Sequence, residues 1–315
     1  MRLLPEYGPA GRICLSFVHE FFNTRFGYGR VLCEIARAAR GHVDVEIFVG
    51  DADVPRLKEY LSRAGLKQDD VMLTLDSPNR GFLAEYMPIF GVSESGEPQG
   101  IVFNCPRLDE HARLRGFVDR FAGTRGIRTV EIPGGFGTAG IAVTDDVVLV
   151  SRAFAPGGNS DPTIRFLREC CPHQEFHAVP PLPIEVSGDL DMFLWPVRPR
   201  TWIGSEYPAG TPQAEALAPT LRLLREHGHT VLPVPGLPVL IFDDVRTTPT
   251  YTNGVILNSA AVVPVYGRPE DFVVKALLNR LGFEVYPVNC SDVIPSGGAI
   301  HCMASVLPKS HSPAK

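Results

Sequence analysis

Apolar residues along the chain follow two spacings, one typical of helices and one typical of short strands. Stretches with apolar residues every three or four positions end at a glycine or other small residue, and a Val/Ile/Phe-rich run follows. Glycine after a last helical turn is a common C-terminal cap, because it adopts the left-handed conformation at little steric cost. Five helix–strand pairs are therefore predicted, over 31–40 and 43–50, 108–122 and 128–135, 162–170 and 175–183, 214–227 and 230–238, and 269–281 and 283–290.

A second β-rich run follows each pair, at 87–93, 145–151, 191–197, 254–267 and 300–308. An additional helix–strand pair, over 54–64 and 70–75, falls inside the first unit. The units recur every ~45 to 60 residues, a period typical of repeat architectures. Helix and strand signals occur in every unit, so the pattern predicts an α/β fold of five mixed units around one axis. No segment has the composition of a linker, and we expect 1–315 to form a single domain.

Composition and charge exclude several classes of protein. Hydrophobic residues make 44% of the chain and charged residues 21%, which is enough for a large core and argues against disorder. The 30 glycines and 29 prolines are scattered, which excludes a long helical bundle. A net charge of −5 provides no basic surface for nucleic acid or an anionic membrane.

Targeting signals and cysteine usage indicate a cytoplasmic protein. No apolar run approaches the ~20 residues of a membrane-spanning helix. Pro5 and Gly8 interrupt the N-terminus before the apolar segment of a secretory signal develops. The seven cysteines include no CxxC pair, and the adjacent Cys170 and Cys171 suit neither a disulfide nor a zinc site. We expect reduced thiols that mostly serve as small packing residues.

The densest chemical signal is SGGAIHCMASVLP, at 296–308. Gly297 and Gly298 remove side-chain bulk, which lets a ligand or another backbone segment approach closely. Cys302 follows four residues after Gly298. In an extended strand His301 and Cys302 face opposite sides, so His301 is a poor candidate for the base that activates the thiol. An inert buried cysteine is the alternative interpretation of Cys302 taken alone.

Several segments together resemble a known family. GGAIHC is similar to the Gly-Gly-x-Ile-His-Cys signature of agmatine deiminases and the bacterial peptidylarginine deiminases that resemble them. GDLDMF (188–193), TYTNGVILNSAAVVPVYG (250–267) and the stretch 76–104 resemble further family segments, most clearly in the C-terminal third. The resemblance implies the pentein fold, a five-bladed α/β propeller of ββαβ-type units with its site on the pseudo-fivefold axis.

The resemblance also implies a reaction without metal or other cofactor. In that family the cysteine is the nucleophile, so Cys302 would attack the central carbon of a small cationic guanidino substrate. Carboxylates hold the guanidinium nitrogens by charge-assisted hydrogen bonds. A histidine then donates a proton to the departing amine and activates water.

The chain departs from the family pattern in this machinery. Asp189 stands where the family has its histidine, whereas Asp191 keeps the acid that follows. Glu85 replaces an Asp, and Pro133 stands where the family has another acid. To act as an acid at neutral pH, Asp189 needs a pKa raised by about 3 units. Asp189 and Asp191 are expected at i and i+2 of a strand, where close carboxylates share a face and raise one another's pKa.

These residues define the predicted site and function. The candidate catalytic residues are Cys302, Asp189 and Asp191, and the candidate substrate-binding residues are Glu85, Asp76, Asn253, Gly297 and Gly298. An anionic Asp189 opposes thiolate formation, so the cationic substrate is expected to assist activation of the thiol. The leading function is hydrolysis of a C–N bond of a guanidino compound through a covalent thiol intermediate. Amidino transfer and a catalytically silent binding protein are the alternatives, and a homodimer is left open.

Overall fold

The computed structural model describes residues 1–19, 27–104, 111–135, 137–183, 187–242 and 245–311. Within them, one unit recurs: two antiparallel strands, a helix, and a third strand parallel to the second. Its clearest copy is β11 (Leu194–Arg198), β12 (Thr201–Glu206), α5 (Pro212–Glu226) and β13 (Thr230–Pro235). The helix makes the crossover that two parallel strands require.

Four more sheets in the described part repeat this order. They contain β5 (Ile89–Val92), β6 (Pro98–Asn104), α3 (His111–Gly123) and β7 (Arg128–Gly135); β8 (Ile141–Val143), β9 (Val147–Ser151), α4 (Pro162–Cys170) and β10 (Glu175–Val179); β16 (Val255–Leu257), β17 (Ala260–Val265), α6 (Asp271–Arg280) and β18 (Glu284–Asn289); and β19 (Ala304–Pro308), β2 (Ala10–Phe17), α1 (Tyr28–Ala39) and β3 (Asp44–Val49).

The last of these sheets joins the two ends of the described chain. Strand β19 pairs antiparallel with β2, so that Ala304 lies opposite Leu15, and β2 pairs parallel with β3. The additional pair predicted within the first unit is also present, as α2 (Val54–Arg63) and β4 (Met72–Thr74). Strand β1 (Arg2–Leu3) pairs with β5, and β14 (Leu240–Phe242) and β15 (Val245–Thr247) form a separate two-stranded sheet.

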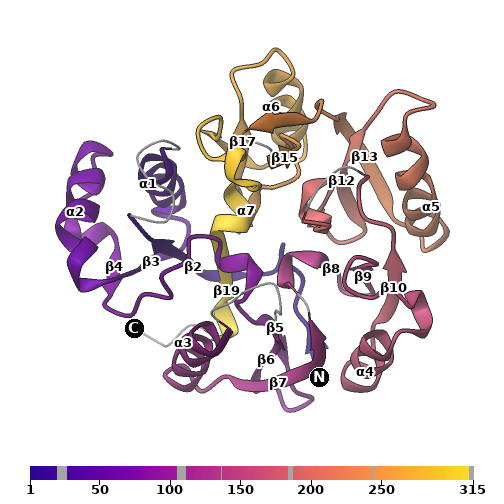
Figure 1. The fold of residues 1–315 in the computed structure, drawn as a ribbon, viewed down its shortest axis with the longest axis horizontal. Coiled ribbons are helices and arrows are strands. Elements are labelled where there is room, and N and C mark those ends of the chain that lie inside the picture. The colour runs from indigo at the N-terminus through magenta and orange to yellow at the C-terminus, as the bar shows by residue number, and fades with distance from the viewer. Residues whose placement is uncertain (20–26, 105–110, 136, 184–186, 243–244, 312–315) are drawn as a thin grey trace.

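Helices α1, α3, α4, α5 and α6 lie toward the outside of the molecule, and the short helix α7 (Ile300–Met303) lies nearer its middle (Figure 1). No helix in the described part is both long and apolar enough to cross a membrane. The structure is thus a mixed α/β fold whose sheets are covered by helices on the outer side.

The glycines predicted to stop helices have the required conformation. Gly41, Gly126, Gly228 and Gly282 have φ angles of 89°, 65°, 75° and 82°, all in the left-handed region. Proline marks helix starts as well. Pro162 opens α4 after Asp161, whose carboxylate accepts the Thr163 N–H at 2.9 Å, and Pro212 opens α5. These local signals explain why the predicted helix boundaries agree closely with the observed ones.

The strand predicted over 300–308 is wrong for its first four residues. Ile300–Met303 form the helix α7, and only Ala304–Pro308 are extended. The cause lies far away in sequence: the side-chain oxygen of Asn253 accepts hydrogen bonds from the backbone N–H groups of Ala299 (3.1 Å) and Cys302 (3.3 Å). It takes the place of an N-cap side chain for this turn.

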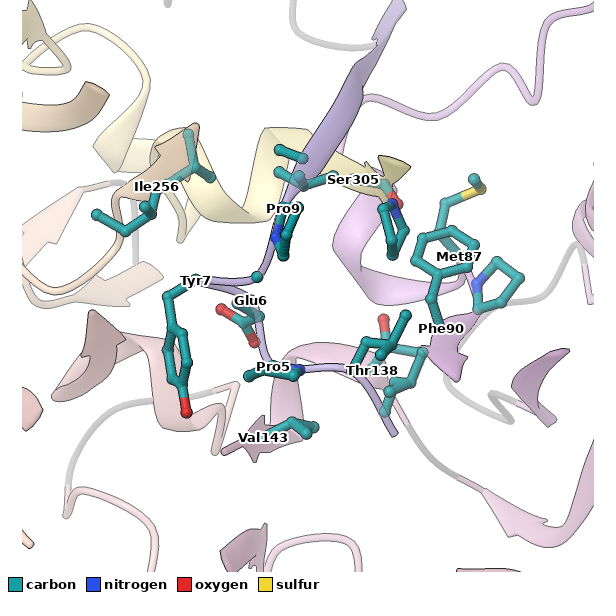
Figure 2. A pocket seen from close by; sticks show the side chains of 18 of the residues that line it. Pro5, Glu6, Tyr7, Pro9, Met87, Phe90, Thr138, Val143, Ile256 and Ser305 are labelled. Carbon is teal, nitrogen blue, oxygen red and sulfur yellow. The ribbon is translucent and has the colours of Figure 1, made fainter. Parts of the chain in front are cut away.

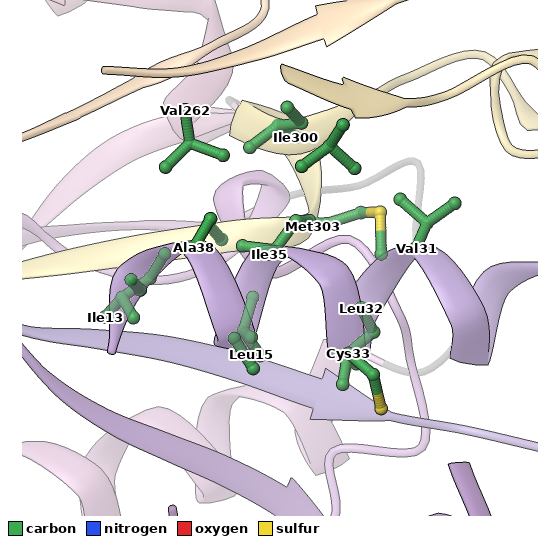
Figure 3. Close-up of a cluster of buried hydrophobic side chains, with 14 of the residues drawn as sticks. Ile13, Leu15, Val31, Leu32, Cys33, Ile35, Ala38, Val262, Ile300 and Met303 are labelled. Carbon is green, nitrogen blue, oxygen red and sulfur yellow. The ribbon is translucent and has the colours of Figure 1, made fainter. Parts of the chain in front are cut away.

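Helix α7 is anchored in the largest apolar cluster of the described residues. Ile300 and Met303 pack there with residues of α1 and the adjoining strands (Figure 3). The members drawn and labelled are Ile13, Leu15, Val31, Leu32, Cys33, Ile35, Ala38, Val262, Ile300 and Met303. This packing holds rigidly the turn that carries Cys302.

Candidate active site

Short turns before the first strands of the sheets meet one another. Helix α7 contacts the 3₁₀ turn η4 (Leu83–Glu85), η4 contacts η5 (Thr138–Gly140), and η5 contacts η7 (Leu190–Met192). Residues 250–254 join them, because the Thr252 hydroxyl donates to the Asp191 carbonyl at 2.8 Å. These turns bring together the predicted site residues Glu85, Asp191 and Cys302, which are distant in sequence.

The thiol of Cys302 lies between a carboxylate and an amide. Its Sγ is 3.3 Å from Asp191 Oδ2, to which the thiol donates, and 3.1 Å from Asn253 Nδ2, which donates to the sulfur. Cys302 is only 5% exposed and Asp191 6%. Asn253 therefore has two functions, since the same side chain orients the α7 backbone through its oxygen.

The surroundings of Cys302 keep the thiol protonated. Burial raises the pKa of the thiol well above its ordinary value, and the negative charges of Asp191 and Asp189 raise it further. The N–H groups of Asn253 and Ala299 act in the opposite direction on this pKa but are outweighed. At neutral pH the group beside Asp191 is therefore S–H, and it becomes a nucleophile only when a base takes its proton or a cation approaches.

The two glycines before the cysteine are needed for different reasons. Gly297 ends the turn at 294–296 with φ of 95° and would have open space around a Cβ, so its requirement is conformational. A Cβ on Gly298 would lie 2.7 Å from both Cβ and Sγ of Cys302 and 3.2 Å from the Phe82 ring. Gly298 thus lets the backbone pass directly over the sulfur.

His301 lies in the same cluster, contrary to the prediction from a strand. Successive side chains in a helix differ by about 100° rather than facing opposite sides, so both His301 and Cys302 reach Asp191. His301 Nδ1 is 2.8 Å from Asp191 Oδ2, and Nε2 is 3.1 Å from Glu6 Oε2. Burial disfavours the imidazolium, but Glu6 and Asp191 outweigh it, and the pKa of His301 lies well above its ordinary value.

The two carboxylate oxygens of Asp191 differ in their hydrogen bonding. Oδ2 accepts from His301 and Cys302, whereas Oδ1 is buried and has no hydrogen-bond partner among the described residues. A buried carboxylate oxygen without a donor is costly, so this atom is available to an N–H or O–H donor of a ligand or of water. The free oxygen belongs to the carboxylate that contacts the thiol.

Asp189 and Asp191 do not lie on a strand as predicted. Asp189 is the extended residue before η7, and Asp191 is within that 3₁₀ turn. Asp189 is partly exposed, and its backbone N–H is held by the Ser187 hydroxyl at 3.1 Å. Its charge still affects Cys302, although less than that of Asp191.

Two predicted substrate-binding acids are engaged by arginines. Glu85 accepts from Arg80 Nε at 2.8 Å, on the turn η4 that contacts α7. Asp76 accepts from both Nε and Nη2 of Arg120, at 2.9 and 2.7 Å, in a bidentate pair with helix α3. Glu85 lies on η4, which belongs to the site. Asp76 instead links the loop that contains it to helix α3.

A cavity of about 740 Å³ lies on the Glu6 side of His301. The N-terminal segment 4–10 crosses it, and Figure 2 shows Glu6 between Pro5 and Tyr7. Most of its other lining is apolar, including Met87, Phe90 and Ile256. Among the described residues its lining includes His301 and not Cys302. The cavity therefore borders the Glu6–His301 pair, and neither Asp191 nor Cys302 is among the described residues that line it.

Glu6 and His301 are the site residues that sequence reasoning missed. His301 is adjacent to Cys302 in sequence, and the strand predicted over 300–308 excludes it as a partner of the thiol because the two side chains would face opposite sides. Glu6 is almost 300 residues away from its partner in sequence, and no local pattern indicates its position. An acidic residue within the apolar stretch between Arg2 and Arg12 is the one local signal at Glu6.

Replacing His301 by glutamine should destabilise the protein more at pH 6 than at pH 9.5. A pKa raised by folding adds stability that is fully present below the unfolded value of about 6.5 and is lost as pH rises through the folded value. Urea unfolding of the wild type and His301→Gln at both pH values measures this difference. His173→Gln, at an exposed histidine, is the control. Equal destabilisation at the two pH values would contradict a charged His301.

Comparisons with known proteins give a family match for part of the chain and a fold match for nearly all of it. Residues 188–308 match the family model described as Porphyromonas-type peptidyl-arginine deiminase. No curated protein matches the chain significantly in sequence. The agmatine deiminase of C. jejuni superimposes with a TM-score of 0.81 at 16% identity, covering 97% of this chain and 95% of that one.

Two further structures extend the comparison. The agmatine deiminase of Enterococcus faecalis has a TM-score of 0.82 at 15% identity, over 98% of this chain and 96% of that chain. The Pseudomonas aeruginosa DDAH, solved with citrulline, is more distant, with a TM-score of 0.56 at 13% identity, over 95% and 100% of the chains. The predicted resemblance to agmatine deiminases and bacterial peptidylarginine deiminases is confirmed, in sequence over residues 188–308 and in fold over nearly the whole chain.

Proposed function

We propose that this protein is a cysteine-dependent hydrolase that cleaves a C–N bond of a small guanidino compound through a covalent thiol intermediate. The observation that carries the proposal is the free, buried Oδ1 of Asp191, on the carboxylate that contacts Cys302 Sγ. A guanidinium presents planar N–H donors suited to such an oxygen. Binding there would place its central carbon next to the sulfur. Relatives of the same fold carry the names of agmatine deiminase and of an enzyme solved with citrulline, which supports this chemistry.

The bound cation activates the thiol. Its positive charge offsets Asp191 and Asp189, whose negative charges raise the pKa of Cys302 in the free protein. As the S–C bond forms, the thiol proton passes to Asp191 Oδ2, where the 3.3 Å contact already exists. The substrate thus supplies the charge that the missing family histidine would otherwise provide.

The remaining steps return the enzyme to its starting state. The C–N bond breaks, and the leaving amine takes the proton held by Asp191. Water then adds to the S-linked amidino carbon and gives a proton to the carboxylate. The C–S bond breaks and Cys302 regains its proton from the carboxylate. The ureido compound leaves after losing its extra proton to the released ammonia or amine, so that guanidinium and water give a neutral ureido product and an ammonium or alkylammonium ion.

The other residues of the cluster orient these groups. Asn253 holds the sulfur and the α7 backbone, and Gly298 leaves the sulfur uncovered by a side chain. His301 acts through Asp191 as a positioning residue: its imidazolium keeps Oδ2 oriented and compensates the buried negative charge. We propose Asp189 as a second carboxylate beside the guanidinium, and Glu85 as a further one at the edge of the site.

The architecture is part of the proposal. We propose that the five recurring units are arranged around a pseudo-fivefold axis as a propeller, and that 1–315 form a single domain. The meeting of η4, η5, η7 and α7 supports this arrangement, because each of these turns leads into the first strand of a different unit. The site would then lie on the axis, where all units contribute residues.

Product formation from guanidino compounds tests the function. The wild-type protein is incubated with agmatine, arginine and guanidino acids, and ureido product and ammonia are quantified. We expect equimolar ureido compound and ammonia from at least one of them. An amidino product that appears only when a second amine is added would indicate amidino transfer instead. No turnover and no covalent amidino adduct with any of these compounds would leave a binding protein and contradict the proposal.

A further inference from the structure

A second group of chemically active side chains lies away from the thiol, between two neighbouring units. Glu175 and His177 are on β10, and His227 follows the last residue of α5. Because residues at i and i+2 of a strand point to the same face, the first two present their side chains together. The ligand atoms of the three residues lie within 4.8 Å of one another. Both elements are in the outer part of the molecule (Figure 1).

The spacing of these atoms is that of metal ligands. Glu175 Oε2 is 3.0 Å from His227 Nε2 and 3.4 Å from His177 Nε2. Tetrahedral zinc with bonds of about 2.0–2.2 Å to nitrogen and oxygen holds its ligands roughly 3.3–3.5 Å apart. The two histidine rings are in edge-to-face contact, with centroids 4.8 Å apart and planes inclined at 67°.

The backbone orients one of the two histidines toward the cluster, and a metal ion would take the place of the proton that its Nε2 shares with Glu175. His227 Nδ1 lies 2.8 Å from the Leu223 carbonyl, so Nδ1–H donates to it and Nε2 faces Glu175. A backbone carbonyl behind the distal ring nitrogen is the usual support of a metal-binding histidine. His177 Nε2 is buried without a hydrogen-bond partner among the described residues.

The surroundings shift the pKa values of the two histidines in opposite directions. Burial lowers the pKa of His177, and the charges of His227 and Arg168 lower it further, while Glu175 opposes them. The Leu223 carbonyl raises the pKa of His227, as do Glu175 and Glu226, against the effect of burial. The negative end of the α5 dipole adds to the attraction for a cation at this place.

We propose that Glu175, His177 and His227 form a zinc site that links β10 to the C-terminal end of α5. Two imidazoles and one carboxylate are donors that suit zinc, and the exposed side of Glu175 leaves the fourth position to water. The ion would bind the folded state more tightly than the unfolded chain, which does not hold the two elements together. It would stabilise the contact between neighbouring units and has no part in the reaction at Cys302.

Metal titration tests the site independently of catalysis. Chelator-treated protein is titrated with Zn²⁺ by calorimetry and with Co²⁺ by visible absorption. We expect one equivalent to bind, a Co²⁺ band of tetrahedral intensity, and a higher thermal midpoint with Zn²⁺. His177→Ala and His227→Ala should each weaken binding by at least about tenfold, and the exposed Glu175→Gln should do so without any effect on folding.

Two controls identify where the metal binds. His173→Ala removes an exposed histidine outside the cluster and should leave binding unchanged. Cys302→Ala should also leave it unchanged, because the proposed site contains no sulfur. Binding that is lost in Cys302→Ala, or that survives in both His177→Ala and His227→Ala, overturns the proposal, as does the absence of saturable binding.

Discussion

Cys302→Ala should abolish turnover and the covalent reaction of the protein with a haloacetamidine. The amidine is cationic and planar like the proposed substrate, so it is expected to bind at Asp191 Oδ1 and to alkylate the sulfur 3.3 Å from the same carboxylate. Loss of a nucleophile typically lowers turnover by a factor on the order of 10⁴ or more. Mass spectrometry of the labelled protein locates the adduct, and the ureido assay measures turnover.

Cys290 provides a matched control for this experiment. It is buried like Cys302, and burial together with Glu34 raises the pKa of its thiol, but among the described residues no carboxylate accepts a hydrogen bond from this thiol. Cys290→Ala should therefore leave both labelling and turnover unchanged. Labelling of the wild type that is no faster at Cys302 than at the more exposed Cys170 would show that the site does not recognise an amidinium.

Asp191→Asn should change the reactivity of Cys302 in opposite directions toward cationic and neutral reagents. Removing the charge lowers the pKa of the thiol, because Asp191 is the strongest of the charges that raise it. Alkylation by neutral iodoacetamide at pH 7 should become faster, by up to about tenfold for each unit of pKa lost. Reaction with the haloacetamidine and turnover should both fall, by about 10²-fold or more, because the charge that binds the guanidinium is gone.

Asp189→Asn separates this effect from a general loss of negative charge. Asp189 raises the pKa of Cys302 less than Asp191 does, and no contact between its side chain and the thiol is needed for that effect. Its iodoacetamide rate should therefore rise less than that of Asp191→Asn. If Asp191→Asn slows both reagents equally while circular dichroism and the unfolding midpoint are unchanged, Asp191 positions the thiol and does not bind the cation.

Local signals in the sequence predicted most of the secondary structure correctly. Glycine stops such as Gly228, proline starts such as Pro162 and the apolar periodicity act over a few residues, so they can be read without the tertiary structure. The strand predicted over 300–308 failed where a distant residue intervened. Asn253 accepts the backbone N–H groups of Ala299 and Cys302 and holds a helical turn that local preference does not indicate.

The sequence by itself determined the repeated α/β unit, the resemblance to guanidine-modifying enzymes and the candidates Cys302, Asp191 and Asn253. Only the tertiary structure decided how the charges around the thiol are arranged. It placed Asp191 between Cys302 and His301, joined Glu6 to the same histidine, and committed Asp76 to Arg120. The physical reason is that electrostatic effects depend on separation in space and on burial, and the residues concerned are separated by up to about 300 positions in the chain.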